Sequence, residues 1–324
     1  MGWKGPRQIR EIDAGENLKD GTMFKNIEEY LDKLKRELRG SDPALIQDAL
    51  FDAEEHLRTA LEETVENTPG ISEEEALQSL VERYGAPSEV ASAYKDIESR
   101  VRPALAVSEK RVTRPRRAKF FGVFTDAQAW GAFLYMLLSG ITGCIFGMWA
   151  LLGTAISLIT LILIIGLPVT GLFLLSIRGI GLVEGRIVEA LLGLRMPRRP
   201  LLVQRNLSWG ERFKALITES HTWKALMYMI LRFPLGLLYF VITAGITSFS
   251  LKCFLYPLWY WVLDRPLITF SQEVYPPVWS IPLISAAGII MMPLILHLVK
   301  SAGRIQGRFA KFMLVRKPRE IDHV

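Results

Sequence analysis

The sequence predicts an all-α protein in which a small cytoplasmic helical domain precedes a polytopic membrane bundle built from a duplicated helical hairpin. Three observations predict this fold class. Residues 1–119 hold most of the acidic side chains and no long apolar run, whereas only nine acidic residues follow. The later part contains four stretches of about 20 mainly apolar residues, the length that crosses a bilayer. This later part also contains an internal sequence repeat.

The acidic part predicts four helices within residues 22–98. Apolar residues recur at helical spacing in "MFKNIEEYLDKLKREL" and again in "SDPALIQDALFDAEEHLRTALEETVEN". Ser72 with Glu75 forms a capping box for a third helix that stops at Gly85, and a fourth begins near Pro87. Residues 1–21 lack apolar periodicity, so we expect them to be disordered.

This stretch resembles the HAAS signalling domain of bacteria. The resemblance lies in "LDKLKREL", "DALFDAEEHLRTALEE" and "SEEEALQSLVERYGAPSEVASAY", and in the order of the helices. It implies a role in intracellular signalling, often beside PadR-like transcription regulators, and it does not imply an enzyme. The following linker, residues 99–119, is basic and contains two prolines, which indicates a tether that can lie on anionic lipid head groups.

The spans are expected at residues 130–150, 154–177, 225–247 and 279–299, with a tight turn at 151–154 between the first two. Lys and Arg are concentrated before the first span, in the 178–224 loop and after the fourth span. The positive-inside rule therefore places both termini in the cytoplasm and the protein in the cell membrane. The aromatic, proline-rich segment 251–278 is expected outside, either on the membrane surface or re-entrant.

Two copies of one unit are visible in this membrane part. Trp130, Tyr135 and Gly143 match Trp223, Tyr228 and Gly236 with one offset of 93 residues. Basic amphipathic segments follow each pair of spans, at 179–200 and 301–318, and share a Gly-Arg motif with an offset of 122 residues. A parallel repeat of this kind predicts a pseudo-twofold axis along the membrane normal.

The membrane part also resembles a sensor-type four-helix transmembrane domain that precedes histidine kinases in other proteins. The resemblance lies in a hairpin of spans, the Gly-Arg segment "EGRIVEALLGLRMP", and a further aromatic-led span, "WKALMYMILRFPLGLLYF". It implies signal reception at the membrane.

Arg232 and His297 are the candidate intramembrane polar site. Arg232 lies near the cytoplasmic end of the third span, where its side chain is expected to reach the head groups; a partner inside the bundle is the alternative. No acidic residue lies within the four expected spans, so a buried ion pair is not expected. The same feature argues against a proton-coupled or sodium-coupled transporter.

Two further groups of residues are candidates for binding. An outer set could contact a stimulus, and an acidic helix face could dock a basic partner, although such a face is more often simply solvated. The outer set is Tyr256, Trp259, Trp261, Asp264 and Arg265, and the acidic face comprises Glu54, Glu55, Glu62 and Glu63.

The sequence contains no recognisable catalytic, cofactor or metal motif. Its two cysteines, Cys144 and Cys253, have no metal-ligand or disulfide spacing. The pI of about 9.3 arises from basic residues that flank membrane helices, so direct nucleic-acid binding is not expected.

The favoured function is a non-enzymatic membrane sensor. It would relay an envelope or lipid-phase signal to a cytoplasmic regulator or kinase, and homo-oligomers are compatible with this. The alternatives are a subunit or accessory of a membrane transporter, or a ligand-free scaffold.

Overall fold

The computed structural model describes residues 24–68, 71–100, 105, 120–162, 166–198, 209–263, 266–269 and 273–315. The fold is all-α, as predicted, apart from one small β-hairpin. The chain forms two compact units. One contains the residues up to Arg39 together with Asp52–Ala93, and the other contains Gly40–Phe51 together with Tyr94–Val324. Residues 1–21 and nearly all of the linker lie outside the described residues.

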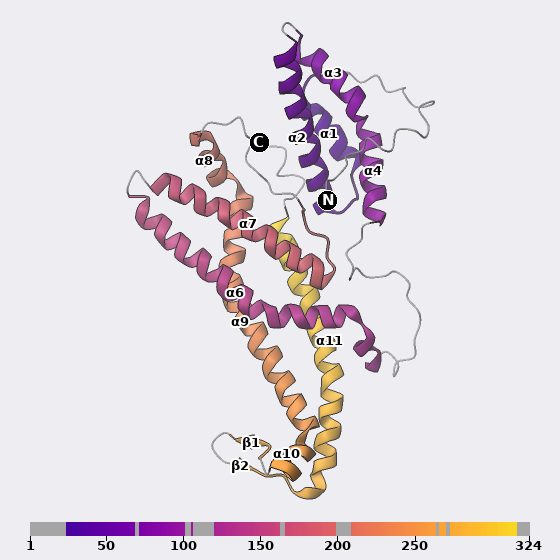
Figure 1. The fold of residues 1–324 in the computed structure, drawn as a ribbon, viewed down its shortest axis with the longest axis vertical. Helices are drawn as coiled ribbons and strands as arrows, with labels where there is room; N and C mark the ends of the chain where they lie inside the picture. Colours follow the sequence, from indigo (N-terminus) through magenta and orange to yellow (C-terminus); the bar gives the residue numbers. More distant parts are fainter. Residues whose placement is uncertain are drawn as a thin grey trace. The chain divides into compact units, whose positions relative to one another are not determined.

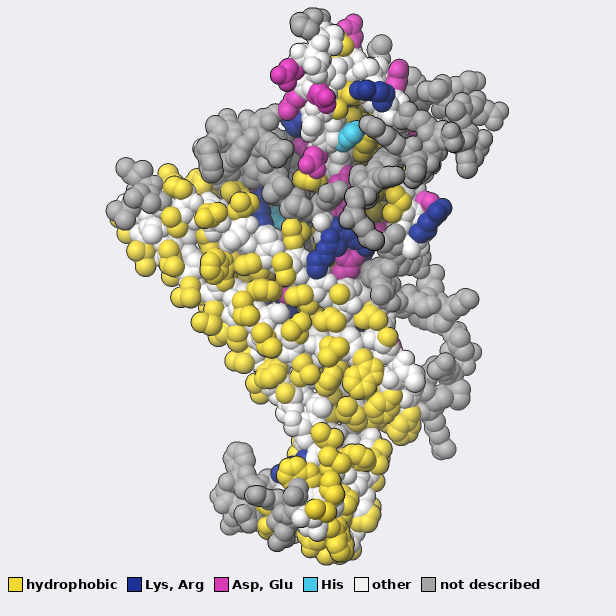
Figure 2. Space-filling model, viewed as in Figure 1, with side chains coloured by type: hydrophobic (Ala, Val, Ile, Leu, Met, Phe, Trp, Pro, Cys, Tyr) yellow, Lys and Arg dark blue, Asp and Glu magenta, His cyan; other side chains and the backbone are white. Residues whose placement is uncertain are grey.

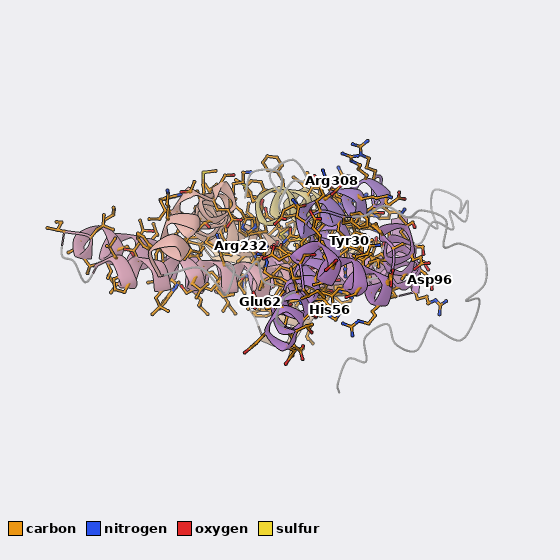
Figure 3. The ribbon with its side chains drawn as sticks, turned by 90° about the horizontal axis from the view of Figure 1, so that it is seen from above. Tyr30, His56, Glu62, Asp96, Arg232 and Arg308 are labelled. Atoms are coloured by element: carbon orange, nitrogen blue, oxygen red, sulfur yellow. The ribbon has the colours of Figure 1, made fainter. Side chains whose placement is uncertain are left out.

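The acidic part forms four helices, α1 (Ile27–Glu37), α2 (Pro43–Asn67), α3 (Glu73–Tyr84) and α4 (Pro87–Arg100). The expected capping box is present at the start of α3, where Ser72 and Glu75 each accept a hydrogen bond from the other's backbone N–H. Tyr30 is fully buried and donates a hydrogen bond to the carbonyl of Gly85 (Figure 3). Burial raises the pKa of Tyr84 to about 12, and His56 stacks on its ring.

Four long helices dominate the second unit: α6 (Ala127–Thr160), α7 (Gly166–Leu192), α9 (Ser220–Phe254) and α11 (Ile281–Leu314) (Figure 1). Each is long and apolar enough to cross a membrane. Hydrophobic side chains cover the face of these helices that Figure 2 shows, and many large ones are more than half exposed. Such a surface fits lipid rather than water, so the chain is a multi-pass membrane protein.

The first hairpin turns later than the sequence indicated. The expected turn at 151–154 lies inside α6, and the connection instead falls between Thr160 and Gly166. Within that segment Gly153 serves helix packing, because a Cβ there would lie 2.0 Å from the Phe173 ring. The amphipathic segments at 179–200 and 301–318 are not separate helices either, because α7 and α11 continue unbroken to Leu192 and Leu314.

Glycines allow α6 and α9 to cross in close contact, and the contact is symmetric. A Cβ on Gly143 would lie 2.6 Å from the Arg232 carbonyl oxygen, and one on Gly236 would lie 2.2 Å from that of Ser139. Gly140 similarly faces Phe240, whereas Gly147 faces Phe233. Residues matched by the 93-residue offset therefore exchange places across the crossing, which is the signature of a pseudo-twofold axis.

Shorter elements surround the long helices. A 3₁₀ turn, η2 (Gly122–Thr125), precedes α6, and α8 (Trp209–Thr218) precedes α9. Between α9 and α11 lie α10 (Tyr256–Leu263), the strands β1 (Ile268–Thr269) and β2 (Glu273–Val274), and η3 (Val278–Ser280). The strands pair antiparallel, with Ile268 opposite Val274. We call the side where α9 ends and α11 begins the α10 end, and the opposite side, where α9 begins, the α8 end.

The close crossing yields a test. Gly236→Ala forces a Cβ against backbone atoms of α6, so we expect it to destabilise the fold by at least about 1–3 kcal/mol. Gly245→Ala is the matched control on the same helix, because nothing lies within 4 Å of its Cβ position. We expect the control to be neutral or more stable by up to about 1 kcal/mol. Thermal unfolding in lipid nanodiscs measures both, and equal melting temperatures would contradict the crossing.

Candidate functional site

A buried ion pair joins two of the long helices. Arg232 of α9 is 1% exposed, and its Nη2 lies 3.0 Å from Oε1 of Glu184 on α7. Both side chains are completely buried. Figure 3 shows Arg232 among the helices, whereas Arg308 lies at their edge. Two opposite charges in a low-dielectric interior attract strongly, but each has lost its water, so the pair must be hydrogen-bonded well.

Three side chains supply further contacts to this pair. The hydroxyls of Tyr135 on α6 and Tyr228 on α9 both donate to Glu184 Oε1, at 3.0 and 3.1 Å. Arg232 donates to Thr142 Oγ1 at 3.2 Å, and its guanidinium carbon lies 4.9 Å from the centre of the Tyr135 ring. We call these five residues the polar cluster. It ties three helices together through Glu184 Oε1 and Arg232 Nη2. Glu184 Oε2 and Arg232 Nε and Nη1 are buried without a hydrogen-bond partner among the described residues, so the pair is only partly satisfied.

Two expectations about Arg232 are therefore wrong. Its side chain does not reach out to head groups but lies inside the bundle. A buried partner is available, because α7 continues past the expected end of the second span and carries Glu184 inward. Because Glu184 is a carboxylate buried among the long helices, the lack of acidic residues in the expected spans no longer speaks against ion-coupled transport.

The repeat is visible in matched polar contacts around the first turns of α6 and α9. The indole of Trp130 donates to the carbonyl of Phe124, and the indole of its counterpart Trp223 donates to that of Ile217. Asp126 pairs with Lys300, and Glu219 pairs with Arg178. These two ion pairs are equivalent under the offsets of 93 and 122 residues, with each acid in one copy and its base in the other.

The polar cluster breaks this symmetry. Arg232 corresponds to Ser139, and Glu184 corresponds to Gln306, by the same offsets. Ser139 and Gln306 are also buried, and Gln306 accepts a hydrogen bond from Tyr239 at 3.2 Å. One side of the pseudo-twofold axis therefore holds the charged pair Arg232 and Glu184, and the other side holds the neutral Ser139 and Gln306. The sequence signal for the site was present in the matched tyrosines and in the motifs "EGR" and "QGR".

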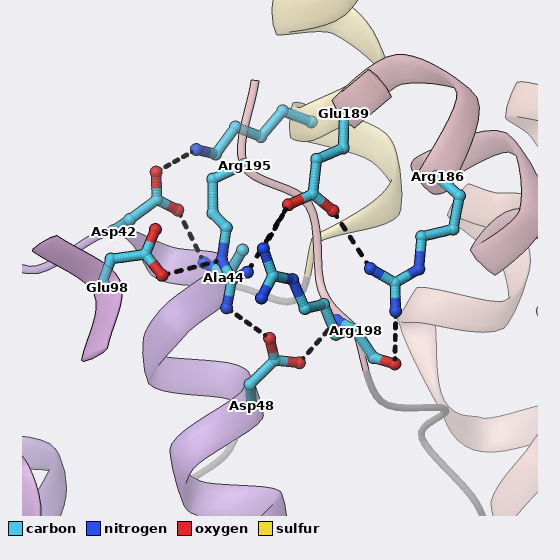
Figure 4. A network of polar contacts seen from close by, with 9 residues as sticks. Asp42, Ala44, Asp48, Glu98, Arg186, Glu189, Arg195 and Arg198 are labelled. Carbon is cyan, nitrogen blue, oxygen red and sulfur yellow. Dashed lines mark hydrogen bonds and ion pairs between the residues drawn. The ribbon is translucent and has the colours of Figure 1, made fainter. Parts of the chain in front are cut away.

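A second ionic network lies in the same unit, around the loop after α7 (Figure 4). Arg195 is 9% exposed and donates to Asp48 at 2.9 Å, and Asp48 also accepts from the backbone N–H of Arg198 at 2.7 Å. Glu189 at the end of α7 pairs with Arg186 and with Arg198. Asp48 belongs to the first turns of α2, so these turns are held by residues of the membrane helices' own unit.

The other candidate residues lie apart from the polar cluster. His297 is exposed on α11, where its ring stacks on Phe120. Tyr256 is fully buried, Trp259 is half-buried and Trp261 is 71% exposed, and Asp264 and Arg265 fall outside the described residues. In the acidic face, Glu54 pairs with Arg58, and the exposed members are Glu55, Glu62 and Glu63.

The fold and the polar cluster define a class: a multi-pass helical membrane protein with two related hairpins and one buried charge pair at their interface. The model of a family described as "Putative sensor" matches residues 135–314, more than half of the chain. The chain therefore belongs to this family, and the match covers all five residues of the polar cluster. No curated protein and no solved structure matches the chain.

The ion pair yields a second test. Glu184→Leu leaves the Arg232 guanidinium buried without its counter-charge, so we expect a loss of about 3–5 kcal/mol in stability. The double variant Glu184→Leu/Arg232→Met removes both charges, and it should recover most of that loss. Unfolding in nanodiscs measures the coupling between the two sites. Additive effects of the two single substitutions would show that the residues do not interact.

Proposed function

We propose that the chain is a membrane sensor that relays an envelope or lipid-phase signal to a cytoplasmic protein partner through its N-terminal helical domain. The family match and the four membrane-spanning helices support the sensor part. The observation that carries the relay is the continuity of α11. This helix starts at the α10 end, and near its other end Lys311 pairs with Asp42, the residue directly before α2.

The two ends of α11 support this role by their contacts. At the α10 end, Ile281 packs in one apolar cluster with Cys253, Tyr256 and Leu267. At the α8 end, Lys311 pairs with Asp42, and the carbonyl of Leu314 contacts the His221 ring at 3.0 Å. A helix of 34 residues is about 50 Å long. A shift at one end of a continuous, packed helix therefore acts directly on contacts at the other end.

The direction of the relay follows from charge. Lys and Arg are concentrated in the segments before the first span, between the second and third spans and after the fourth span, and the positive-inside rule assigns these segments to the cytoplasm of a cell membrane. On this arrangement the helical domain, with its resemblance to HAAS domains, is the output. Its acidic face is the proposed docking site for a basic surface on a regulator or kinase.

The transporter alternative gains one supporting observation. A buried carboxylate beside an arginine and two tyrosines is a familiar composition for an intramembrane proton or ion site. The sensor remains the better-supported function because of the family match.

The relay predicts coupling over the length of α11. In Gly288→Leu the new side chain meets the backbone of Phe254 and Ser250, which pushes α9 and α11 apart at the α10 end. We expect faster amide hydrogen exchange in residues 40–51, because the Lys311–Asp42 pair is strained. Ile289→Leu, at a neighbouring exposed position, is the control. Unchanged exchange in residues 40–51 of a folded Gly288→Leu variant would contradict transmission through α11.

The output role predicts loss of a partner on charge reversal. We expect Glu62→Lys/Glu63→Lys to lose a regulator or kinase that co-purifies with the full chain from native membranes. Glu73→Lys/Glu74→Lys makes the same charge change on exposed positions of α3 and should retain it. If both variants keep all partners while the purified protein conducts solutes in liposomes, the transporter alternative is correct.

A further inference from the structure

The helix α10 has two apolar faces. Tyr256 is fully buried, and together with the half-buried Trp259 and Tyr260 it packs on Cys253, Leu267 and Ile281. The opposite face consists of Leu258, Trp261 and Val262, which are 53%, 71% and 68% exposed. These three residues follow the i, i+3, i+4 spacing of one helix face. A helix that faced water would carry polar residues there.

The exposed face of α10 continues the lipid-facing surface of the long helices. Leu251 and Phe254 near the end of α9 are 54% and 46% exposed, and Trp279 and Leu283 at the start of α11 are 73% and 64% exposed. Figure 2 shows hydrophobic side chains along the helices and over the α10 end on the face in view. An apolar surface of this kind at the end of membrane-spanning helices has one natural occupant, which is the same lipid that surrounds the spans.

The composition further specifies where in the lipid this helix lies. With eight residues, α10 is too short to cross a bilayer. Tryptophan is enriched at the level of the head groups, and two exposed tryptophans lie here. The ammonium group of Lys252 lies 5.8 Å from the centre of the Trp259 ring, where a phosphate group could accept from it.

We propose that α10 is a lipid-binding element that lies at the head-group level of the bilayer, with Leu258, Trp261 and Val262 in the acyl region beside it. The proposal rests on the sensor function above and deepens it, because it names phospholipid as the stimulus. Two hydrogen bonds join α9 and α11 next to α10: Ser250 donates to the Gly288 carbonyl at 3.0 Å, and Ser285 donates to that of Phe254 at 3.3 Å. A change in lipid packing that moves α10 therefore moves the contact between α9 and α11.

Spin-label depth measurement tests this placement in the full chain. A nitroxide is attached at Val262→Cys in a background with Cys144→Ala and Cys253→Ala, in vesicles of phosphatidylethanolamine and phosphatidylglycerol. Two other exposed aliphatic positions bracket it: Val65→Cys on α2 and Ile145→Cys in the middle of α6. We expect the nitroxide at position 262 to collide with oxygen, and with a water-soluble nickel chelate, at rates that lie between the rates at positions 65 and 145.

Either extreme overturns the proposal. Nickel accessibility equal to that at position 65 means that α10 faces water and is open to a soluble ligand, whereas oxygen accessibility equal to that at position 145 means that it is re-entrant. If the cysteine-free background does not fold, quenching of tryptophan fluorescence by lipids brominated near the head group replaces the measurement. The brominated lipids should quench a smaller part of the tryptophan emission in Trp261→Phe than in the unsubstituted chain. Equal quenching in the two proteins overturns the proposal. Neither result depends on hydrogen exchange in residues 40–51, so this proposal and the relay can fail separately.

Discussion

The membrane unit depends on one constraint: Arg232 is charged and its side chain is fully buried. A guanidinium in an apolar bundle needs a counter-charge and hydrogen-bond acceptors, and here Nη2 has both, whereas Nε and Nη1 have no hydrogen-bond partner among the described residues. Glu184 from α7 supplies the charge, and Thr142 from α6 accepts a further hydrogen bond. The relative positions of α6, α7 and α9 follow from this, because a slide of α7 or α9 along its axis would separate the pair. A slide of α6 would remove the hydrogen bonds of Tyr135 and Thr142. The glycine contact between α6 and α9 makes the approach close enough.

Two less buried ion pairs extend the same logic. Asp126 with Lys300 and Glu219 with Arg178 join the two copies reciprocally. In each pair the acid is more exposed than the base, so these pairs are more open to screening by salt than the central one. Around Asp48 the same chemistry holds the first turns of α2 against the loop after α7.

Much of this architecture could be predicted from the sequence, because it depends on local patterns. Four apolar stretches and the two offsets between matched residues, 93 and 122, give the helices and their pseudo-symmetry directly. The polar cluster was not predicted although the repeat matches its tyrosines, because Glu184 is at a helix position that composition assigns to the water interface. Glu184 sits among Gly181, Gly185 and Arg186, which together resemble an interfacial segment. Only the packing of α7 shows that its acidic side chain turns inward while Arg186 turns outward. The turn between the first two helices was placed too early, because α6 continues to Thr160 with Gly153 packed against the Phe173 ring.

The internal duplication has a consequence for how charge can be distributed about an axis. A homodimer of a one-hairpin chain would place every residue at its interface twice, so an arginine near the axis would face its own copy. Two guanidinium groups would then compete for the same buried space. When both hairpins belong to one polypeptide, matched positions can carry different residues: Ser139 and Gln306 stand at the positions that match Arg232 and Glu184. Covalent fusion thus permits a charge pair on one side of the axis only. Strict twofold symmetry would place the same charges on both sides.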